Sequence, residues 1–364
     1  MNIVLTNDAM DIAGGENFVL FLAGGLRRRG HHVIIAPMTG SDLAAKAREE
    51  NHEVIEIPYA GSKLHAINMF AKALKNKNID IIHTNSNIDR TVGAFVAKKL
   101  HCTCVASIHS CFSIQRNLTH WYRNKFLINH FTPDGYSTKK ILLEKDGIPE
   151  RKITVVHDGV PHESIKFNAE ARAEVRRQLQ IADDEIVIGA IGRLVEFKGH
   201  TYLLKATAKL LEDIANQKIK VVIVGDGELK ETLLAESSAL GVDKNVIFTG
   251  QRTDLSGLYS SFDIFSQPSK DFGGETFPLT MLHALSFGLP VVGTDAGDIR
   301  FQIINGENGF LVEPENVDAL AEALQKLIHN KALRDSMGKV SFKHFLQNYT
   351  LDAMVDKFEA IYKR

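Results

Sequence analysis

The sequence has little of several residue types, and each shortage excludes a class of protein. Only 3 of its 364 residues are cysteine. This odd count argues against a disulfide framework and favours reduced thiols in the cytoplasm. No apolar run approaches the roughly 20 residues that a membrane-spanning helix needs. Residues 1–5 lack a basic stretch before their apolar run, so we expect a strand there and not a signal peptide.

The chain also lacks a strong net charge, and it lacks the ligand spacing of a metal site. The formal net charge is −1, which gives no indication of nucleic-acid binding. Residues 1–168 hold 21 Lys+Arg against 16 Asp+Glu, whereas residues 169–364 hold 22 against 28. The basic first half favours an anionic acceptor or a membrane surface as a partner. Cys102 and Cys104 have no nearby Cys or His pair at zinc-finger spacing, so we expect structural cysteines and no metal.

Short apolar runs alternate with helical patterns twice along the chain. In the first half we predict helices at 17–29 and 91–100 and strands at 2–6, 32–36, 53–57, 79–83, 103–108 and 153–156. After a polar bridge at 168–180, we predict helices at 202–211, 255–260, 280–287 and from 317 onward, and strands at 186–191, 220–224, 246–249, 264–266 and 291–292. This alternation predicts an α/β protein with parallel sheets.

The restart of the pattern predicts two Rossmann-like domains that face a central cleft. We place a first, acceptor-binding domain at residues 1–168 and a second, nucleotide-sugar-binding domain at 169–346. The C-terminal helix, at about 347–364, is expected to pack back on the first domain. Ligands of open parallel sheets bind outside the carboxyl ends of the strands, so we expect the site there.

Two cations follow the predicted strand 186–191. Arg193 stands in the run Gly192-Arg193-Leu194, and Lys198 follows five residues later. Such a pair suits a diphosphate, although a solvated pair of surface cations is the alternative. Downstream, Lys230 occupies the place where a dinucleotide fingerprint beginning at Gly225 needs its third glycine, which excludes a nicotinamide site.

A Gly-rich loop carries Glu275 to the start of a predicted helix. Pro278 suits the first helical position, where its missing N–H costs little. The free N–H groups of that helix start would face a phosphate, and Glu275 could hold sugar hydroxyls. Alternatively, the Glu275 carboxylate only complements the helix dipole.

In their order along the chain, these segments resemble the retaining glycosyltransferases of family 4, which have the GT-B fold. The resemblance covers nearly the whole chain and includes Gly14-Gly15, 155–160, 192–194 with 198–199, 224–227, Pro268-Ser269, 288–292 and 308–312.

The resemblance implies a role for each matching residue. Arg193 and Lys198 would bind the donor's pyrophosphate, Glu275 would contact the donor sugar, and Gly15 would approach the donor phosphates. His109 would face the reaction centre as a second catalytic residue, although a lone histidine at a strand end is more often a satisfied structural residue. The other expected donor-binding positions are Gly225, Thr276, Phe277, Leu279 and His283. His283 departs from the family, because it stands where relatives carry the second glutamate of an E-x7-E motif.

The implied activity is transfer of a sugar from a UDP- or GDP-linked donor to an acceptor hydroxyl of a glycan or lipid-linked molecule. We expect retention of the anomeric configuration, no metal and no further cofactor, and a place in bacterial surface glycan or lipopolysaccharide assembly. The departure at His283 keeps an inactive sugar-nucleotide-binding protein open as an alternative, and a GT-B-fold epimerase is another.

A further stretch, residues 116–131, predicts contact of the first domain with a membrane. Aromatic and apolar residues alternate there with Arg116, Arg123 and Lys125; the apolar members are Trp121, Tyr122, Phe126 and Leu127. We expect a cytoplasmic protein with peripheral contact at the inner membrane face. The alternative is an ordinary amphipathic helix that packs on the sheet.

Overall fold

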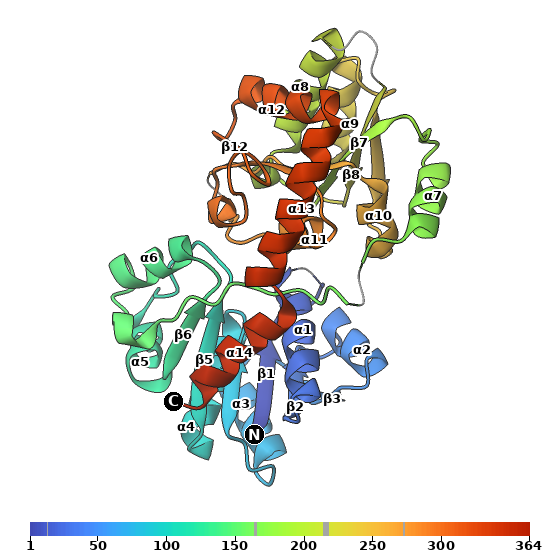
Figure 1. Ribbon diagram of the computed structural model, residues 1–364. Coiled ribbons are helices and arrows are strands. Elements are labelled where there is room, and N and C mark those ends of the chain that lie inside the picture. Colours follow the sequence, from blue (N-terminus) through green and yellow to red (C-terminus); the bar gives the residue numbers. More distant parts are fainter. Residues whose placement is uncertain (13, 164–165, 214–217, 272–273) are drawn as a thin grey trace. The chain divides into compact units, whose positions relative to one another are not determined.

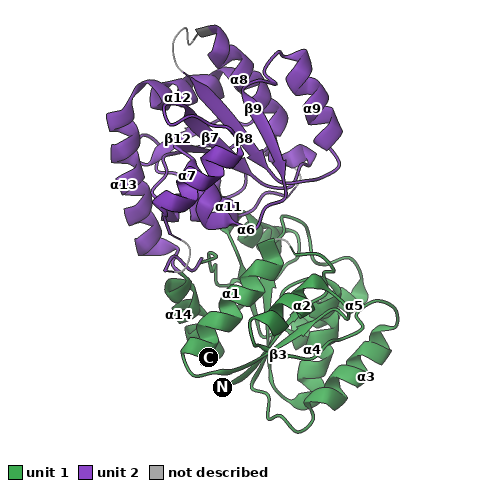
Figure 2. Ribbon diagram, turned by 90° about the vertical axis from the view of Figure 1, so that its right-hand side faces the viewer, with its two compact units in different colours: residues 1–159, 351–364 green, residues 160–350 purple. Residues whose placement is uncertain are grey.

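The computed structural model describes the chain except residues 13, 164–165, 214–217 and 272–273 (Figure 1). It divides into two compact units (Figure 2). Unit 1 comprises Met1–Gly159 and Leu351–Arg364, and unit 2 comprises Val160–Thr350. The division therefore falls between Gly159 and Val160, whereas the sequence placed it near residue 168.

Unit 1 is built on a six-stranded parallel sheet of order β3-β2-β1-β4-β5-β6. Its strands are β1 (Asn2–Asn7), β2 (His32–Pro37), β3 (Glu53–Val54), β4 (Ile81–Thr84), β5 (Thr103–Ile108) and β6 (His130–Pro133). The inner strands are buried along nearly their whole length, since helices cover both faces of a parallel sheet. This burial explains why they read as continuous apolar runs.

The helices of unit 1 include one from the far end of the chain. They are α1 (Gly14–Arg28), α2 (Asp42–Glu49), α3 (Lys63–Leu74), α4 (Ile88–Leu100), α5 (Leu118–Tyr122), the π-helical turn η1 (Arg123–Leu127), α6 (Tyr136–Glu144), the 3-10 turn η2 (Glu150–Lys152) and α14 (Leu351–Tyr362). Helix α14 packs on α1, where a Cβ at Gly25 would lie 2.5 Å from the Val355 side chain. The Phe18 and Phe358 rings of these two helices are 5.8 Å apart.

The predicted strand at 153–156 is wrong. Only Ile153 forms a bridge, to Phe131, and β6 takes the sixth place in the sheet. The N–H groups of Thr154 and Val156 do donate to the carbonyl oxygens of Phe131 and Pro133, each at 3.0 Å. Pro133 has no N–H with which to return a bond, so the pairing stays one-sided.

Unit 2 is built on a second six-stranded parallel sheet, of order β12-β11-β10-β7-β8-β9. Its strands are β7 (Ile186–Ile191), β8 (Ile219–Val224), β9 (Val246–Gly250), β10 (Ile264–Gln267), β11 (Val291–Thr294) and β12 (Gly309–Val312). Its helices are α7 (Ala169–Gln178), the 3-10 turn η3 (Glu196–Lys198), α8 (His200–Asp213), α9 (Lys230–Ala239), α10 (Leu255–Ser261), α11 (Leu279–Ser286), the 3-10 turn η4 (Ile299–Phe301), α12 (Val317–His329) and α13 (Lys331–Asn348).

The two sheets share one topology, which confirms the predicted α/β fold with two Rossmann-like domains. In each unit the first strand lies between the unit's second and fourth strands, so the strand order reverses beside it. The reversal falls between β1 and β4 in unit 1 and between β7 and β10 in unit 2. Open α/β sheets bind their ligands at such switch points, outside the carboxyl ends of the strands. Among the described residues, no helix is long and apolar enough to cross a membrane.

Candidate functional site

The switch point of unit 2 brings Lys198 and Glu275 together. Lys198 follows β7 and Glu275 follows β10, and Lys198 Nζ lies 2.8 Å from Glu275 Oε2. Their side chains are only 13% and 6% exposed, so water screens this ion pair weakly. The same Oε2 atom accepts hydrogen bonds from Ser269 Oγ at 2.7 Å and Gln267 Nε2 at 3.1 Å. Three donors therefore fix one carboxylate oxygen at the end of a central strand.

Neighbouring loops hold this carboxylate in place. Gln267 Oε1 accepts a hydrogen bond from Thr280 Oγ1 at 3.1 Å, which fixes the orientation of its amide. Gly297 adopts a left-handed φ of +55°, and a Cβ there would lie 2.5 Å from the carbonyl oxygen of Glu275. The backbone of this glycine turn packs directly on the Glu275 segment as a result, and Asp298 N donates to Thr276 O at 2.8 Å.

Arg193 lies beside Lys198, with the Phe197 ring as their shared neighbour. The Arg193 guanidinium carbon is 5.7 Å and Lys198 Nζ is 5.4 Å from the centroid of that ring. Both distances suit cation–π contacts. Arg193 is exposed. Two cations thus stand at the carboxyl end of β7, where a diphosphate would meet them.

Gly225 has a packing role that its motif alone did not indicate. Its φ is +142°, and a Cβ there would lie 1.9 Å from the carbonyl oxygen of Gly192. Only glycine allows the turn after β8 to approach the loop that carries Arg193 this closely.

The segment before and within α11 holds the remaining predicted residues of unit 2. The prediction that Pro278 is the first helical residue is wrong by one position. Pro278 is the N-cap, with an extended ψ of 120°, and the helix begins at Leu279. Phe277 is 3% exposed and its ring lies 5.5 Å from that of Tyr349, so its side chain belongs to the core. Thr276 is also buried.

His283 lies inside α11 and is electrically neutral at pH 7. Its ring is 5.6 Å from the ring of Tyr259, and the residue is 6% exposed. Burial lowers the pKa of His283 to about 4. A neutral imidazole there cannot supply the negative charge of a glutamate.

Unit 1 places His109 beside two buried carboxyl groups. His109 Nδ1 lies 3.8 Å from Asp134 Oδ2 and 3.9 Å from Asp158 Oδ1. Burial, and secondly the Arg90 cation, lowers the pKa of His109 to about 4. Burial, and secondly the Asp134 charge, raises the pKa of Asp158 well above its usual range. The site therefore holds a neutral imidazole next to two carboxyl groups. Ionisation of both Asp134 and Asp158 is unfavourable, because the two charges would repel each other in a buried site.

Gly15 and His109 are connected through helix α1. Gly15 lies in the first turn of α1, and a Cβ there would meet no atom of the described residues within 4 Å. The Phe18 ring of the same helix is 4.5 Å from the His109 ring. Among the described residues, packing does not require a glycine at this position. The open space beside Gly15 leaves room for a ligand.

Sequence reasoning assigned no role to several residues of these sites. Gln267 and Ser269 flank the end of a central strand, and that position was an available signal. Asp134 follows β6, a strand that the apolar pattern did not predict, so no comparable signal existed for it.

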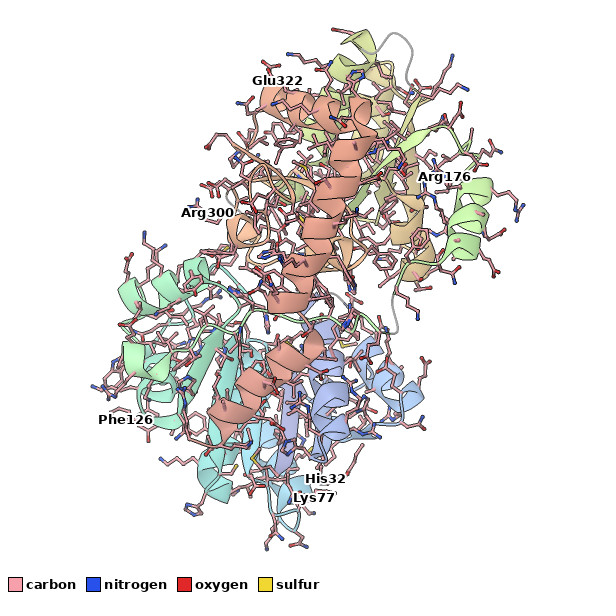
Figure 3. All side chains as sticks on the ribbon, viewed as in Figure 1. His32, Lys77, Phe126, Arg176, Arg300 and Glu322 are labelled. Carbon is pink, nitrogen blue, oxygen red and sulfur yellow. The ribbon has the colours of Figure 1, made fainter. Side chains whose placement is uncertain are left out.

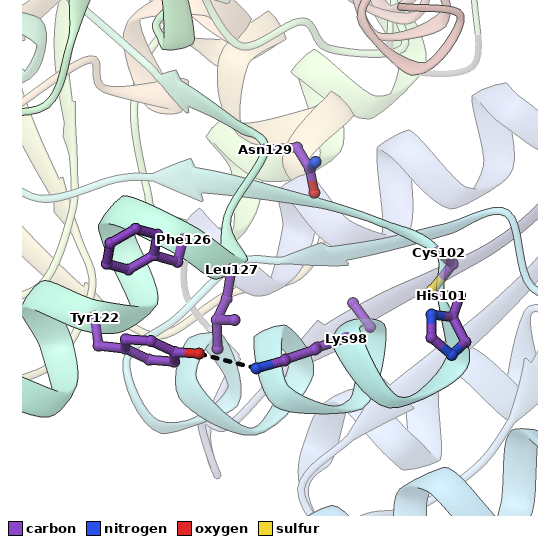
Figure 4. A pocket seen from close by; sticks show the side chains of 8 residues that line it. Lys98, His101, Cys102, Tyr122, Phe126, Leu127 and Asn129 are labelled. Carbon is purple, nitrogen blue, oxygen red and sulfur yellow. Dashed lines mark hydrogen bonds between the residues drawn. The ribbon is translucent and has the colours of Figure 1, made fainter.

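A separate hollow of about 410 Å³ lies in unit 1 (Figure 4). Its lining includes Lys98, His101, Cys102, Tyr122 and Asn129, and Lys98 Nζ donates to Tyr122 Oη at 2.9 Å. Cys102 and Asn129 precede β5 and β6, so this hollow lies at the amino ends of these strands. The predicted site residues of unit 1, Gly15 and His109, follow β1 and β5 and so lie at the carboxyl ends of the strands. Among the described residues, no group of three or more His, Cys, Asp or Glu side chains is arranged to hold a metal ion.

Comparison with known proteins places both units in one enzyme family. Residues 12–164 match the family model Glycosyltransferase Family 4, and residues 171–344 match the model Glycosyl transferases group 1. A D-inositol 3-phosphate glycosyltransferase of Corynebacterium aurimucosum is 32% identical over 193 residues, which cover 51% of this chain and 45% of that protein. An uncharacterized glycosyltransferase of Methanocaldococcus jannaschii is 30% identical over 201 residues, 55% of this chain and 50% of that protein. The matches thus span about half the length of these curated relatives.

Solved structures agree over the whole chain. A glycosyltransferase from Rickettsia africae has a TM-score of 0.88 at 22% identity and covers 100% of this chain and 97% of its own. HepE of Anabaena, solved in complex with UDP, has a TM-score of 0.86 at 18% identity and covers 100% of both chains. At these identities the likeness shows the fold. With the two family matches, it establishes that this chain belongs to the family 4 glycosyltransferases of the GT-B fold.

Proposed function

We propose that the protein transfers a sugar from a nucleotide-linked donor to an acceptor hydroxyl, with retention of the anomeric configuration. The Lys198–Glu275 pair at the switch point of unit 2 is the observation that carries this proposal. A cation for the phosphates and a fixed carboxylate for the sugar stand side by side there. HepE, with a similar fold, has also been solved with UDP-glucose, which supports a UDP-linked donor over a GDP-linked one.

In the proposed reaction, the bond between the anomeric carbon and the pyrophosphate oxygen breaks first. Arg193 and Lys198 neutralise the charge that develops on the leaving nucleoside diphosphate. The Glu275 carboxylate stabilises the positive charge that develops on the sugar ring. The acceptor oxygen then bonds to the anomeric carbon on the face that the phosphate left, and the leaving phosphate takes the acceptor's proton. Positioning and charge neutralisation supply most of the rate enhancement.

Retention and metal independence follow from this assignment of roles. Arg193 and Lys198 take the place that a divalent cation would have beside the pyrophosphate. His109 is neutral, so we assign it a hydrogen bond to the reacting sugar and no transfer of a net charge. Gly15 is proposed to approach the donor phosphates, and Gly225, Thr276, Phe277, Leu279 and His283 to line the donor site.

A second candidate function is binding of a sugar nucleotide without turnover. The buried, neutral His283 favours it, because it replaces a carboxylate that would accept two ribose hydroxyl bonds. An epimerase of the same fold would use the same donor site and need no acceptor.

The biological setting proposed is surface glycan or lipopolysaccharide assembly, with a glycan or lipid-linked acceptor. A lipopolysaccharide outer core galactosyltransferase, WaaB, resembles the chain with a TM-score of 0.72 at 18% identity, covering 100% of this chain and 99% of its own. A cytoplasmic location with peripheral membrane contact through unit 1 belongs to the same proposal.

Incubation with a panel of UDP- and GDP-sugars, with and without hydroxyl acceptors, tests the three functions. Transfer predicts nucleoside diphosphate release that acceptors accelerate. Release of free nucleoside diphosphate and an isomerised sugar without acceptor would identify an epimerase. Tight nucleotide binding with no consumption of any donor would identify the inactive binding protein.

A further inference from the structure

The switch point of unit 1 contains a buried arginine that the proposed transfer does not use. Arg90 lies in the first turn of α4, which follows β4, and β4 pairs with β1 at the reversal of strand order. The residue is 3% exposed. Its Nε atom is fully enclosed and has no hydrogen-bond acceptor among the residues that the structure describes. Within the described part of the chain, no carboxylate lies within the 4.0 Å limit of an ion pair with Arg90.

A second buried arginine stands beside it. Arg123 is 1% exposed and comes from η1. It donates to three neutral acceptors, namely Asn124 Oδ1 at 2.8 Å, Thr91 Oγ1 at 3.0 Å and Ile114 O at 3.0 Å. Thr91 is the neighbour of Arg90 on α4. Burial, and secondly the Arg90 cation, lowers the pKa of Arg123 to about 9, so Arg90 adds to the cost of burying Arg123.

The acidic residues near Arg90 accept hydrogen bonds from donors other than Arg90. Asp8, Asp89 and Asp146 are the carboxylates whose charge acts on Arg90. They accept hydrogen bonds from β1, from the loops and from the start of α4: Thr6 Oγ1 to Asp89 at 2.5 Å, Asn85 N to Asp89 at 2.9 Å, Asp89 N to Asp8 at 3.2 Å, Ile114 N to Asp146 at 3.1 Å and Gln115 N to Asp146 at 3.2 Å. Their attraction for the guanidinium groups is therefore long-range, and it leaves Arg90 Nε without an acceptor among the described residues.

A structural role explains this arrangement poorly. Buried charges in proteins are normally paired and hydrogen-bonded, because an unpaired buried cation strongly destabilises the fold. Guanidinium groups present pairs of parallel N–H donors that match the two oxygens of a carboxylate or phosphate. A site that is selected to bind an anion retains such a group despite its cost.

We propose that Arg90, supported by Arg123, binds an anionic oxygen group of the acceptor, either a phosphate or a carboxylate. This inference rests on the proposed function and on the expectation from the sequence that the first domain binds the acceptor. His109 follows β5, the neighbour of β4, and the Arg90 charge contributes to lowering the pKa of His109. The anionic group would thus lie close to the residue proposed to face the reaction centre. The net positive charge of residues 1–168 favours the approach of such an acceptor.

Calorimetric titration of the full chain with inorganic phosphate, and separately with acetate, tests the site. We expect Arg90→Met to weaken binding of the preferred anion at least tenfold. Arg151→Met is the matched control, because Arg151 is exposed on η2 and should leave binding unchanged. Stronger binding of phosphate than of acetate would identify a phosphorylated acceptor, and the reverse a carboxylated one. Equal anion affinity of wild type and Arg90→Met would overturn the proposal.

Thermal unfolding separates a ligand site from a structural one. If Arg90 is an unpaired binding group, Arg90→Met should raise the Tm in anion-free buffer and abolish the rise in Tm that the anion causes. A fall in Tm for Arg90→Met, with the anion effect intact, would overturn the proposal by showing a structural cation. UDP binding to unit 2, measured on the same samples, should be unchanged. Failure of the wild type to bind either UDP or GDP would instead contradict the proposed function.

Discussion

At the scale of single residues, the site depends most on one carboxylate oxygen. Glu275 Oε2 is held by Lys198, Ser269 and Gln267 within 3.1 Å. Its charge is expected to act on positive charge that exists only in the transition state. Such an interaction changes turnover and not simply affinity.

We predict that Glu275→Gln lowers kcat by roughly 100-fold or more, the usual effect of losing one positioned electrostatic contact. Steady-state kinetics at saturating donor measures it. Glu322→Gln is the matched control, since Glu322 is exposed on α12 (Figure 3). Normal turnover of Glu275→Gln would contradict the role assigned to this residue.

His283 should act differently, because it stands where relatives contact the unreactive ribose. We predict that His283→Ala weakens nucleotide binding by about 1 kcal/mol, the worth of one neutral hydrogen bond, and leaves kcat nearly unchanged. Calorimetric titration with UDP gives the affinity. The unfolding temperature of the variant controls for the cavity that loss of a buried ring creates. Loss of turnover at saturating donor would show that His283 has a catalytic role.

The sequence predicted individual residues where a motif marks them, but not their partners. The loop of Glu275 is recognisable, whereas its contacts to Gln267 and Ser269 depend on how β10 ends. Arg123 is a clearer example of a residue whose surroundings could not be predicted from the sequence. We predicted an exposed cation, and the residue is 1% exposed. Helix α5 changes into the π-helical turn η1 at this residue, which rotates the following side chains away from regular helical spacing.

At the scale of elements, α5 and η1 still present an apolar surface. Leu118, Trp121 and Phe126 are 85%, 41% and 56% exposed, and Phe126 is visible at the edge of unit 1 (Figure 3). Lys125 Nζ lies 4.9 Å from the centroid of the Trp121 ring. Leu127, which we predicted in the same surface, is 8% exposed and belongs to the core.

We predict that a triple variant, Trp121→Ala with Lys125→Ala and Phe126→Ala, binds anionic liposomes at least tenfold more weakly than wild type. Each removed cation and buried ring contributes about 1 kcal/mol or more to membrane binding. Sedimentation with vesicles measures it, and Phe342→Ala, a change at an exposed ring on α13, is the control. Equal partition of wild type and triple variant would refute membrane contact through this surface.

Helix α14 is fixed to the sheet of unit 1 by a buried histidine. His83 Nδ1 lies 2.6 Å from Tyr362 Oη, and His83 Nε2 lies 2.7 Å from Ser107 Oγ. Burial lowers the pKa of His83 from 6.5 to about 3. Between these values the unfolded chain binds a proton that the folded chain does not. Stability from the neutral ring is therefore complete above pH 6.5 and is lost as the pH falls toward 3.

We predict that the free energy of unfolding falls by up to about 1.4 kcal/mol per pH unit for this group over that range. Denaturant unfolding at several pH values measures the slope. His83→Gln should be less stable at pH 7 but should show a shallower slope. Tyr362→Phe should lose about 1 kcal/mol at every pH, as a hydrogen bond alone would. An unchanged slope in His83→Gln would contradict this account.

Elements were predictable where an apolar run lies between clear breaks. The strands 103–108 and 186–191 have the predicted bounds. The short strand β6 was missed, because His130 and Pro133 occupy two of its four positions. The spacing of apolar residues indicates only local burial. Whether a segment becomes a strand also depends on the strand that it pairs with, and the local pattern does not contain that information.

At the scale of the whole molecule, the repeated strand–helix alternation was sufficient to predict two parallel α/β units. It could not predict the strand order within each sheet, because that order depends on contacts distant in sequence. The order determines the site: it places the loops of Lys198 and Glu275 on neighbouring strands, although 77 positions separate them.

The roles of Arg193 and Lys198 lead to a prediction for the complete enzyme. Turnover should be unchanged, within about twofold, in excess chelator, because we propose that these cations neutralise the leaving group. Lys198→Gln should lower turnover by roughly 100-fold, by the same magnitude argument as for Glu275. Added magnesium should not restore the turnover of Lys198→Gln. A chelator-dependent loss that magnesium or manganese reverses would contradict this assignment.

The most direct test of the central claim is an NMR time course of the wild-type protein with a panel of UDP- and GDP-sugars and hydroxyl acceptors. The account predicts release of the nucleoside diphosphate together with a glycoside whose anomeric configuration is that of the donor. A product of inverted configuration, or no consumption of any donor despite tight nucleotide binding, would contradict it.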